Sequence, residues 1–222
     1  MGHASMGKIM WVDLGRGTIK IESIPDTLYQ KVLSGVGLAA HLLYERIPPG
    51  ADPLGPDNIL GFVSGLLTGT GSLFTGRWMV TGKSPLTGGW GDANCGGNFS
   101  PAIKRCGVDG IFFTGISPRP VYLLADKGRA ELRDATELWG RDTVETEEIL
   151  KQQADGRSLR VACIGPAGEK QSLIAGVAND GGRMAARSGL GAVMGSKRLK
   201  AVALSGGQRI PVHDRETIKT LS

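Results

Sequence analysis

Long apolar segments are missing from this 222-residue sequence. No stretch approaches the roughly 18 uninterrupted apolar residues of a membrane-spanning helix, and the N-terminus lacks a basic region followed by an apolar run. We therefore predict neither a membrane span nor a signal peptide, and we expect a cytoplasmic protein. Residues 1–7 are set apart from the fold as a candidate leader sequence.

Cysteine and histidine are scarce. The three cysteines, Cys95, Cys106 and Cys163, form no C-x-x-C pair, which argues against a disulfide scaffold and against a metal site made within this chain alone. The three histidines lie far apart in the sequence, and His41 falls in an apolar helical pattern. We predict His41 to be a core or surface residue rather than a ligand.

Nucleic-acid and nucleotide signatures are also missing. Aromatic residues make up only 5% of the chain, and its Lys and Arg residues are scattered although the net charge is +5. The sequence contains neither the G-x-x-x-x-G-K-[ST] loop nor the dinucleotide-binding glycine fingerprint. We predict no nucleic-acid partner, and the positive charge suits another anionic ligand.

Glycine, in contrast, is abundant, with 35 residues. The other proportions, 41% hydrophobic and 21% charged, are those of a globular protein. Because this glycine follows no G-X-Y period, we expect many positions with positive φ or with close backbone approach, including approach to a ligand.

The order of predicted elements occurs twice along the chain. Alternating apolar runs predict hairpins over 8–24 and 119–135, each followed by a helix, a buried strand, a second strand, a glycine-rich segment, a short helix and a closing strand. The acidic residues Glu145, Glu147 and Glu148 are predicted to form a solvated face of the helix over 143–153.

We therefore predict an α+β fold: an internally duplicated domain over 8–212, with two mixed or antiparallel β-sheets and short helices. Its repeats, about 8–117 and 118–208, would be related by a pseudo-two-fold axis, and 213–222 would begin a linker to a following domain. A two-fold axis places equivalent segments around one central position.

Two glycine-rich segments are such a pair: "GGWGDANCGG" (88–97) and "GGRMAARSGLG" (181–191). We interpret both as loops whose missing Cβ atoms let backbone groups approach a bulky polar ligand, with Arg183 and Arg187 suited to phosphate. Taken singly, each segment is better explained by tight turns in a sheet protein, and it is the symmetric pair that favours a ligand. Cys95 fits either a buried thiol or a ligand contact.

The sequence resembles the N-terminal domain of the tungsten-containing aldehyde ferredoxin oxidoreductase family. The resemblance runs from about Lys8 to Val212 and rests on "VDLGRGTIKIE", "TGRW", "SPLTG", "DANCGG", "GPAGE" and "RSGLGAVMGSKRLKA" in that order. It implies a domain that carries two molybdopterins whose dithiolenes hold one tungsten, with one pterin for each repeat.

The resemblance also assigns residues to this cofactor. By motif, Arg77 would contact a pterin on the side facing an iron–sulfur cluster, and Asn94, Cys95, Gly96 and Gly97 would line one pterin.

The other pterin would be lined by Arg183, Met184, Ala185 and Arg187. A magnesium ion would bridge the pterin phosphates, with the backbone carbonyls of Asn94 and Met184 as symmetric contacts, which suits a hard cation that prefers oxygen.

Family members are roughly three times as long as this chain, and the resemblance places the cysteine ligands of a [4Fe-4S] cluster outside it. We expect the chain alone to be incomplete and inactive, to need further domains or a partner subunit, and to be capable of homodimer formation. The implied activity is oxidation of aldehydes to carboxylic acids, with ferredoxin as electron acceptor. A related reaction, such as aromatic acyl-CoA reduction, and a stand-alone pterin- or anion-binding module remain alternatives.

Overall fold

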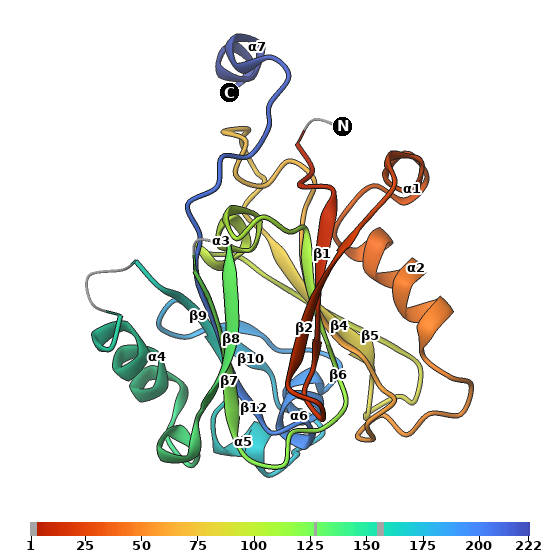
Figure 1. Ribbon diagram of the computed structural model, residues 1–222, viewed down its shortest axis with the longest axis vertical. Helices are drawn as coiled ribbons and strands as arrows, with labels where there is room; N and C mark the ends of the chain where they lie inside the picture. The colour runs from red at the N-terminus through yellow and green to blue at the C-terminus, as the bar shows by residue number, and fades with distance from the viewer. Residues whose placement is uncertain (1–3, 127, 155–157) are drawn as a thin grey trace.

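The computed structural model describes residues 4–126, 128–154 and 158–222. These residues fold into two six-stranded mixed sheets connected by short helices, which confirms the predicted α+β class (Figure 1). No helix among the described residues is long and apolar enough to cross a membrane.

The first sheet has the strand order β2-β1-β6-β3-β4-β5. The pair β1–β6 is parallel and the other neighbours are antiparallel. The strands are β1 (Lys8–Asp13), β2 (Thr18–Ser23), β3 (Leu60–Ser64), β4 (Trp78–Lys83), β5 (Trp90–Cys95) and β6 (Gly110–Thr114).

The second sheet repeats this topology. Its order from the β8 edge is β8-β7-β12-β9-β10-β11, again with one parallel pair, β7–β12. The strands are β7 (Val121–Asp126), β8 (Arg129–Asp134), β9 (Arg160–Cys163), β10 (Val177–Asn179), β11 (Arg183–Ala185) and β12 (Leu199–Ser205). Each sheet lies within one predicted repeat, and the exact domain boundaries stay a prediction.

The helices form layers around the sheets. α1 (Asp26–Val32) and α2 (Val36–Arg46) pack on the outer face of the first sheet, and α4 (Thr143–Gln152) packs on the outer face of the second (Figure 1). α3 (Phe99–Arg105) and α6 (Leu190–Ser196) lie between the sheets. The remaining helices are η1 (Thr136–Leu138), α5 (Pro166–Glu169) and α7 (Arg215–Leu221).

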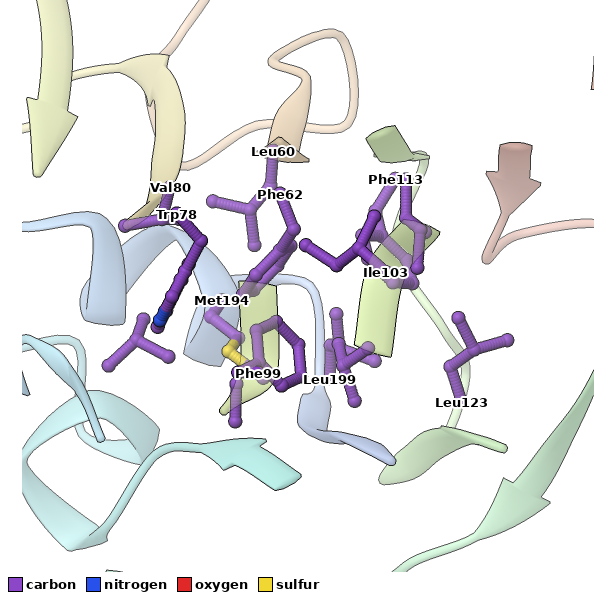
Figure 2. Packing of buried hydrophobic residues seen from close by; sticks show 14 of the residues in the cluster. Leu60, Phe62, Trp78, Val80, Phe99, Ile103, Phe113, Leu123, Met194 and Leu199 are labelled. Atoms are coloured by element: carbon purple, nitrogen blue, oxygen red, sulfur yellow. The ribbon is translucent and has the colours of Figure 1, made fainter. Parts of the chain in front are cut away.

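The main core lies between the two sheets and joins the repeats. Figure 2 shows Phe62 and Trp78 of the first sheet close to Phe99 of α3 and Met194 of α6. The ring centroids of Trp78 and Phe99 are 4.9 Å apart, and all four side chains are fully buried. Because each repeat contributes to this core, burial of apolar surface holds the two halves together.

Two local predictions were wrong. The first glycine-rich segment is not a loop, because Trp90–Cys95 pairs with β4 as strand β5. The second contains strand β11 for the same reason. Within the candidate leader, the amides of Met6 and Gly7 donate to Asp109 Oδ2 at 2.8 and 3.0 Å, and the assignment of residues 1–7 as a leader stays a prediction.

Several glycines of the second repeat serve packing rather than ligand approach. A Cβ at Gly195 of α6 would lie 2.6 Å from the carbonyl carbon of Gly168 in α5. A Cβ at Gly191 would lie 2.8 Å from the carbonyl carbon of Ala175. The motifs "GPAGE" and "GLGAVMG" therefore let α6 pack directly against the backbone of its neighbours.

Lys197 follows α6 and is fully buried, with its Nζ donating to the Gly115 carbonyl at 3.1 Å. Burial lowers its pKa from 10.5 to about 8, and the charge of Asp57 opposes this only weakly. Because the unfolded chain then binds more protons between pH 8 and 10.5, the free energy of unfolding should rise with pH in that window.

We expect Lys197→Met to remove this contribution. Wild type should gain on the order of 2 kcal/mol relative to the variant as the pH rises through this window. Urea unfolding of both proteins at each end of the window measures the gain. If the free energies of unfolding of the two proteins differed by the same amount at both pH values, the lowered pKa of Lys197 would be contradicted. The pKa of Lys104 is also lowered to about 8, but its contribution is the same in both proteins and cancels in the comparison.

Candidate functional site

The edge strands β5 and β11 bring the two glycine-rich segments into contact, each from a different sheet. Asn94 pairs with Met79 of β4, and Met184 pairs with Ala178 of β10. Because β4–β5 and β10–β11 occupy the same place in the two sheets, Asn94 and Met184 are equivalent positions of the repeats. Both side chains are exposed.

Two guanidinium groups converge on the segment that follows β5. Arg77 Nε donates to Asn94 Oδ1 at 2.8 Å, and Arg77 Nη2 donates to the same oxygen. A Cβ at Gly96 would lie 4.0 Å from Arg77 Nη1 and 3.8 Å from Arg183 Nη1. Since both arginines are exposed, this face presents two positive charges that can bind an anion.

Cys95 lies beneath this face and is only 5% exposed. Its Sγ donates to Asn179 Oδ1 at 3.1 Å. Burial raises the pKa of the thiol, and the nearby Arg77 and Arg183 oppose that shift less strongly. Cys95 is therefore a buried thiol with a raised pKa, and a contact with a ligand stays a prediction.

The turn between β10 and β11 takes left-handed backbone at three consecutive residues: φ is 46° at Asp180, 71° at Gly181 and 122° at Gly182. Glycine meets this conformational demand without strain. A Cβ at Gly181 or Gly182 would meet no atom within 4 Å, so the turn is open to a ligand.

Helix α4 supports this turn from behind. The Gly181 amide donates to Glu147 Oε2 at 2.8 Å, and Glu147 is only 3% exposed. The prediction of a fully solvated acidic face was therefore wrong for Glu147, whose other oxygen pairs with Lys151. Glu145 and Glu148 are exposed as predicted.

Most of the predicted site residues thus lie on one face or directly beneath it. Ala185 is fully buried, so only its backbone lies at this face. Arg187 is exposed, and its guanidinium has no hydrogen bond or ion pair with the described part of the chain. Sequence reasoning missed Asn179, Asp180 and Glu147, whose partners lie 34 to 84 residues away.

Among the described residues, no group of three or more His, Cys, Asp or Glu side chains could hold a metal ion. The predicted magnesium contacts need no such group, since they are the backbone carbonyls of Asn94 and Met184. The arginines, the open glycine turn and the equivalent strands fit a large anionic group that contacts both repeats.

A large cavity lies elsewhere. It is a groove of about 1180 Å³ between α2 and the β4–β5 hairpin, lined by apolar and aromatic side chains that include Tyr44 and Trp90. None of the predicted site residues lines it. The candidate site is an open face, which is expected of a surface that other parts of a protein can cover.

Residues 9–206 match the family model described as aldehyde ferredoxin oxidoreductase, N-terminal domain. The chain is 43% identical over 214 residues to the tungsten-containing aldehyde ferredoxin oxidoreductase of Thermococcus kodakarensis. It is 41% identical over the same length to the enzyme of that name from Pyrococcus furiosus. Both alignments cover 96% of this chain and 35% of the relative.

Two further relatives have other activities. An aliphatic sulfonate oxidoreductase, WOR-like subunit, from Pyrococcus furiosus is 32% identical over 236 residues, covering 99% of this chain and 37% of the relative. The solved active-site complex BamBC of benzoyl coenzyme A reductase matches with a TM-score of 0.94 and 37% identity, covering 97% of this chain and 33% of that one. The chain thus spans about a third of the length of these relatives.

Proposed function

This chain belongs to the aldehyde ferredoxin oxidoreductase family, a family of tungsten-containing oxidoreductases, and from that premise we propose that it carries a bis-pterin tungsten cofactor. The cofactor would lie on the face formed by β5, β11 and Arg77. The observation that carries this proposal is the convergence of Arg77 and Arg183 on Gly96, between equivalent segments of the two repeats.

The residues of this face take separate roles in the proposal. Asn94, Gly96 and Gly97 lie in the segment that would line one pterin; Cys95 supports that segment from beneath. Met184 and its strand neighbours Arg183 and Ala185, followed by Arg187, would line the other. The carbonyls of Asn94 and Met184 would contact magnesium, a role suited to their equivalent positions.

The cofactor, when bound, would supply two-electron chemistry at tungsten. The chain itself would bind and orient it. Arg77 and Arg183 place positive charge where a phosphate or a reduced, anionic group is stabilised, and the glycines let backbone amides and carbonyls approach it. The buried Cys95 thiol keeps its proton, so it supports the segment through its bond to Asn179 rather than acting as a ligand.

For the complete protein we propose oxidation of an aldehyde with water to a carboxylic acid, with electrons passed through a [4Fe-4S] cluster to ferredoxin. The higher identity to aldehyde oxidoreductases than to the sulfonate and benzoyl-CoA enzymes favours aldehydes. The cluster ligands and the substrate pocket would come from further domains or from a partner subunit.

Metal and pterin analysis tests this proposal directly. We expect the complete protein, made in a tungsten-handling host, to contain about two pterins per tungsten and to reduce a viologen dye when given an aldehyde. The chain of 222 residues alone should give no aldehyde-dependent reduction. Absence of both tungsten and pterin from the complete protein would overturn the proposal, and pterin without turnover would favour a stand-alone binding module.

A further inference from the structure

Asn179 and Asp180 connect the two repeats at the candidate site. Asn179 Oδ1 accepts from Cys95 Sγ at 3.1 Å, and Asn179 Nδ2 donates to the Gly96 carbonyl at 3.2 Å. Asp180 Oδ2 accepts from the backbone amide of Asn98. Every partner lies in residues 95–98, at the end of β5 and directly after it, so we call Asn179 and Asp180 together the inter-repeat brace.

Asn179 and Asp180 pack tightly against Gly97. Gly97 has φ of +113°, and a Cβ there would lie 2.8 Å from Asn179 Nδ2 and closer still to Asp180 Oδ2. The contact therefore requires glycine at this position for two reasons, backbone conformation and space. Asn179 and Asp180, which directly precede the second glycine-rich segment, therefore restrain the end of the first.

This connection is one-sided. The residue of the first repeat equivalent to Asn179 is Val80, which lies in the middle of β4 and pairs with Ala93. Strand β4 continues to Lys83, whereas β10 ends at Asn179 and leaves Asp180 free to reach the other repeat. The duplicated fold thus carries the brace in one repeat only.

The brace is itself held firmly. Asn179 is fully buried, and the next residue but one, Gly181, donates its amide to the buried Glu147 of α4. Helix α4 packs on the core of the second sheet. A continuous path of contacts therefore runs from that core through the turn to the segment containing Gly96.

We propose that Asn179 and Asp180 are positioning residues that hold the two cofactor-binding segments at a fixed separation. The proposal rests on the proposed function, because a cofactor that contacts both segments needs them correctly spaced before it binds. Neither residue needs to touch the cofactor. Their effect would pass through Gly96, Gly97 and Asn98.

The charge of Asp180 and its positioning role predict opposite effects on cofactor binding. Asp180 lies close enough to Cys95 for its negative charge to raise the pKa of that thiol, against Arg77 and Arg183. Removing the Asp180 carboxylate makes the face more positive, which by electrostatics alone should strengthen binding of an anionic cofactor. Loss of cofactor on removing Asp180 therefore reports lost positioning and not lost charge.

The test compares Asp180→Gly with Asp180→Asn. Glycine tolerates the positive φ of residue 180 but removes the acceptor, whereas asparagine keeps an acceptor oxygen. Asp134→Ala is the matched control, since it removes a similar bond, from Thr136 N to Asp134 Oδ1 at 2.8 Å, on β8 at the opposite edge of the sheet from β11.

Two readouts are needed. On this chain, amide hydrogen exchange at Asn98 should become at least about tenfold faster in Asp180→Gly, and near wild type in Asp180→Asn and the control. In the complete protein from a tungsten-handling host, Asp180→Gly should retain less than about half of the wild-type pterin and tungsten, with substantial rescue in Asp180→Asn.

Each other outcome counts against the proposal. Unchanged exchange at Asn98 would mean that the brace does not restrain the segment. Faster exchange with wild-type or higher cofactor content would show a merely structural bond. If wild-type protein itself contains neither pterin nor tungsten, the proposed function fails and this inference with it, while the exchange result still reports on the bond itself.

Discussion

Replacing Gly195 by alanine is expected to destabilise the fold by about 3 kcal/mol or more. The added Cβ would lie 2.6 Å from the carbonyl carbon of Gly168 and 3.2 Å from Glu169 Cα. These neighbours are backbone atoms of α5, so no side-chain rotation relieves the clash. Helix α6 would have to move away from α5, and α6 belongs to the core that joins the two repeats.

A shift of α5 that relieves this clash would also disturb a buried ion pair. Glu169 of α5 pairs with Lys200 of β12 at 2.5 Å, and their side chains are 5% and 0% exposed. Lys200 Nζ also donates to the Arg141 carbonyl at 2.8 Å. Shifting α5 to accommodate a methyl group at residue 195 would stretch this pair, and a buried charge that loses its partner is costly.

Denaturant unfolding of this chain measures the effect, with Gly207→Ala as the control. Gly207 is exposed, and a Cβ there meets nothing within 4 Å, so its replacement should change stability by no more than about 0.5 kcal/mol. Equal unfolding midpoints for the two variants would show that α5 and α6 are not packed backbone to backbone.

The duplicated architecture could be predicted because it depends on the order of elements. Strand, turn and helix signals recur in the same sequence in both halves, and the two sheet orders confirm the correspondence. Strand β5 escaped prediction for a physical reason. Its inward residues Gly91, Ala93 and Cys95 are small, so the period-two burial pattern carries little hydropathy contrast.

The candidate site, too, could be predicted from the sequence only in part. Arg77, Asn94 and Arg183 could be named because the resemblance carries them in short motifs. Asn179 and Asp180 could not, since their role depends on partners more than 80 residues distant that the two-fold arrangement brings close. Neither residue stands out locally, because Asn and Asp beside two glycines are ordinary turn formers.

Removing both Arg77 and Arg183 should strongly lower the cofactor content of the complete protein. A charge-assisted hydrogen bond is worth about 1.5–3 kcal/mol, and every 1.4 kcal/mol is a factor of about ten in affinity. We therefore expect the double variant Arg77→Ala/Arg183→Ala to bind pterin at least about tenfold more weakly. Arg187→Ala removes a guanidinium that has no hydrogen bond or ion pair with the described residues, and it tests the one arginine that only the sequence motif assigns to the cofactor.

The matched control is Arg16→Ala, because Arg16 lies in the exposed turn between β1 and β2 and pairs only weakly with Asp13 at 3.8 Å. It should leave pterin and tungsten at wild-type amounts. Unchanged cofactor content in the double variant would show that the two guanidinium groups are not part of the cofactor site, even though the family assignment would stand.

The same double variant has a signature that requires no cofactor. Arg77 and Arg183 both lower the pKa of the Cys95 thiol, in opposition to burial, so their removal should raise that pKa and slow alkylation of Cys95. Cys106 and Cys163 give little background, since burial raises the pKa of each to about 12. Slower alkylation of Cys95 on this chain, together with pterin loss in the complete protein, would tie the convergence of the two arginines to cofactor binding. Slower alkylation without pterin loss would mean that Arg77 and Arg183 lie close to Cys95 but that the cofactor binds at another place.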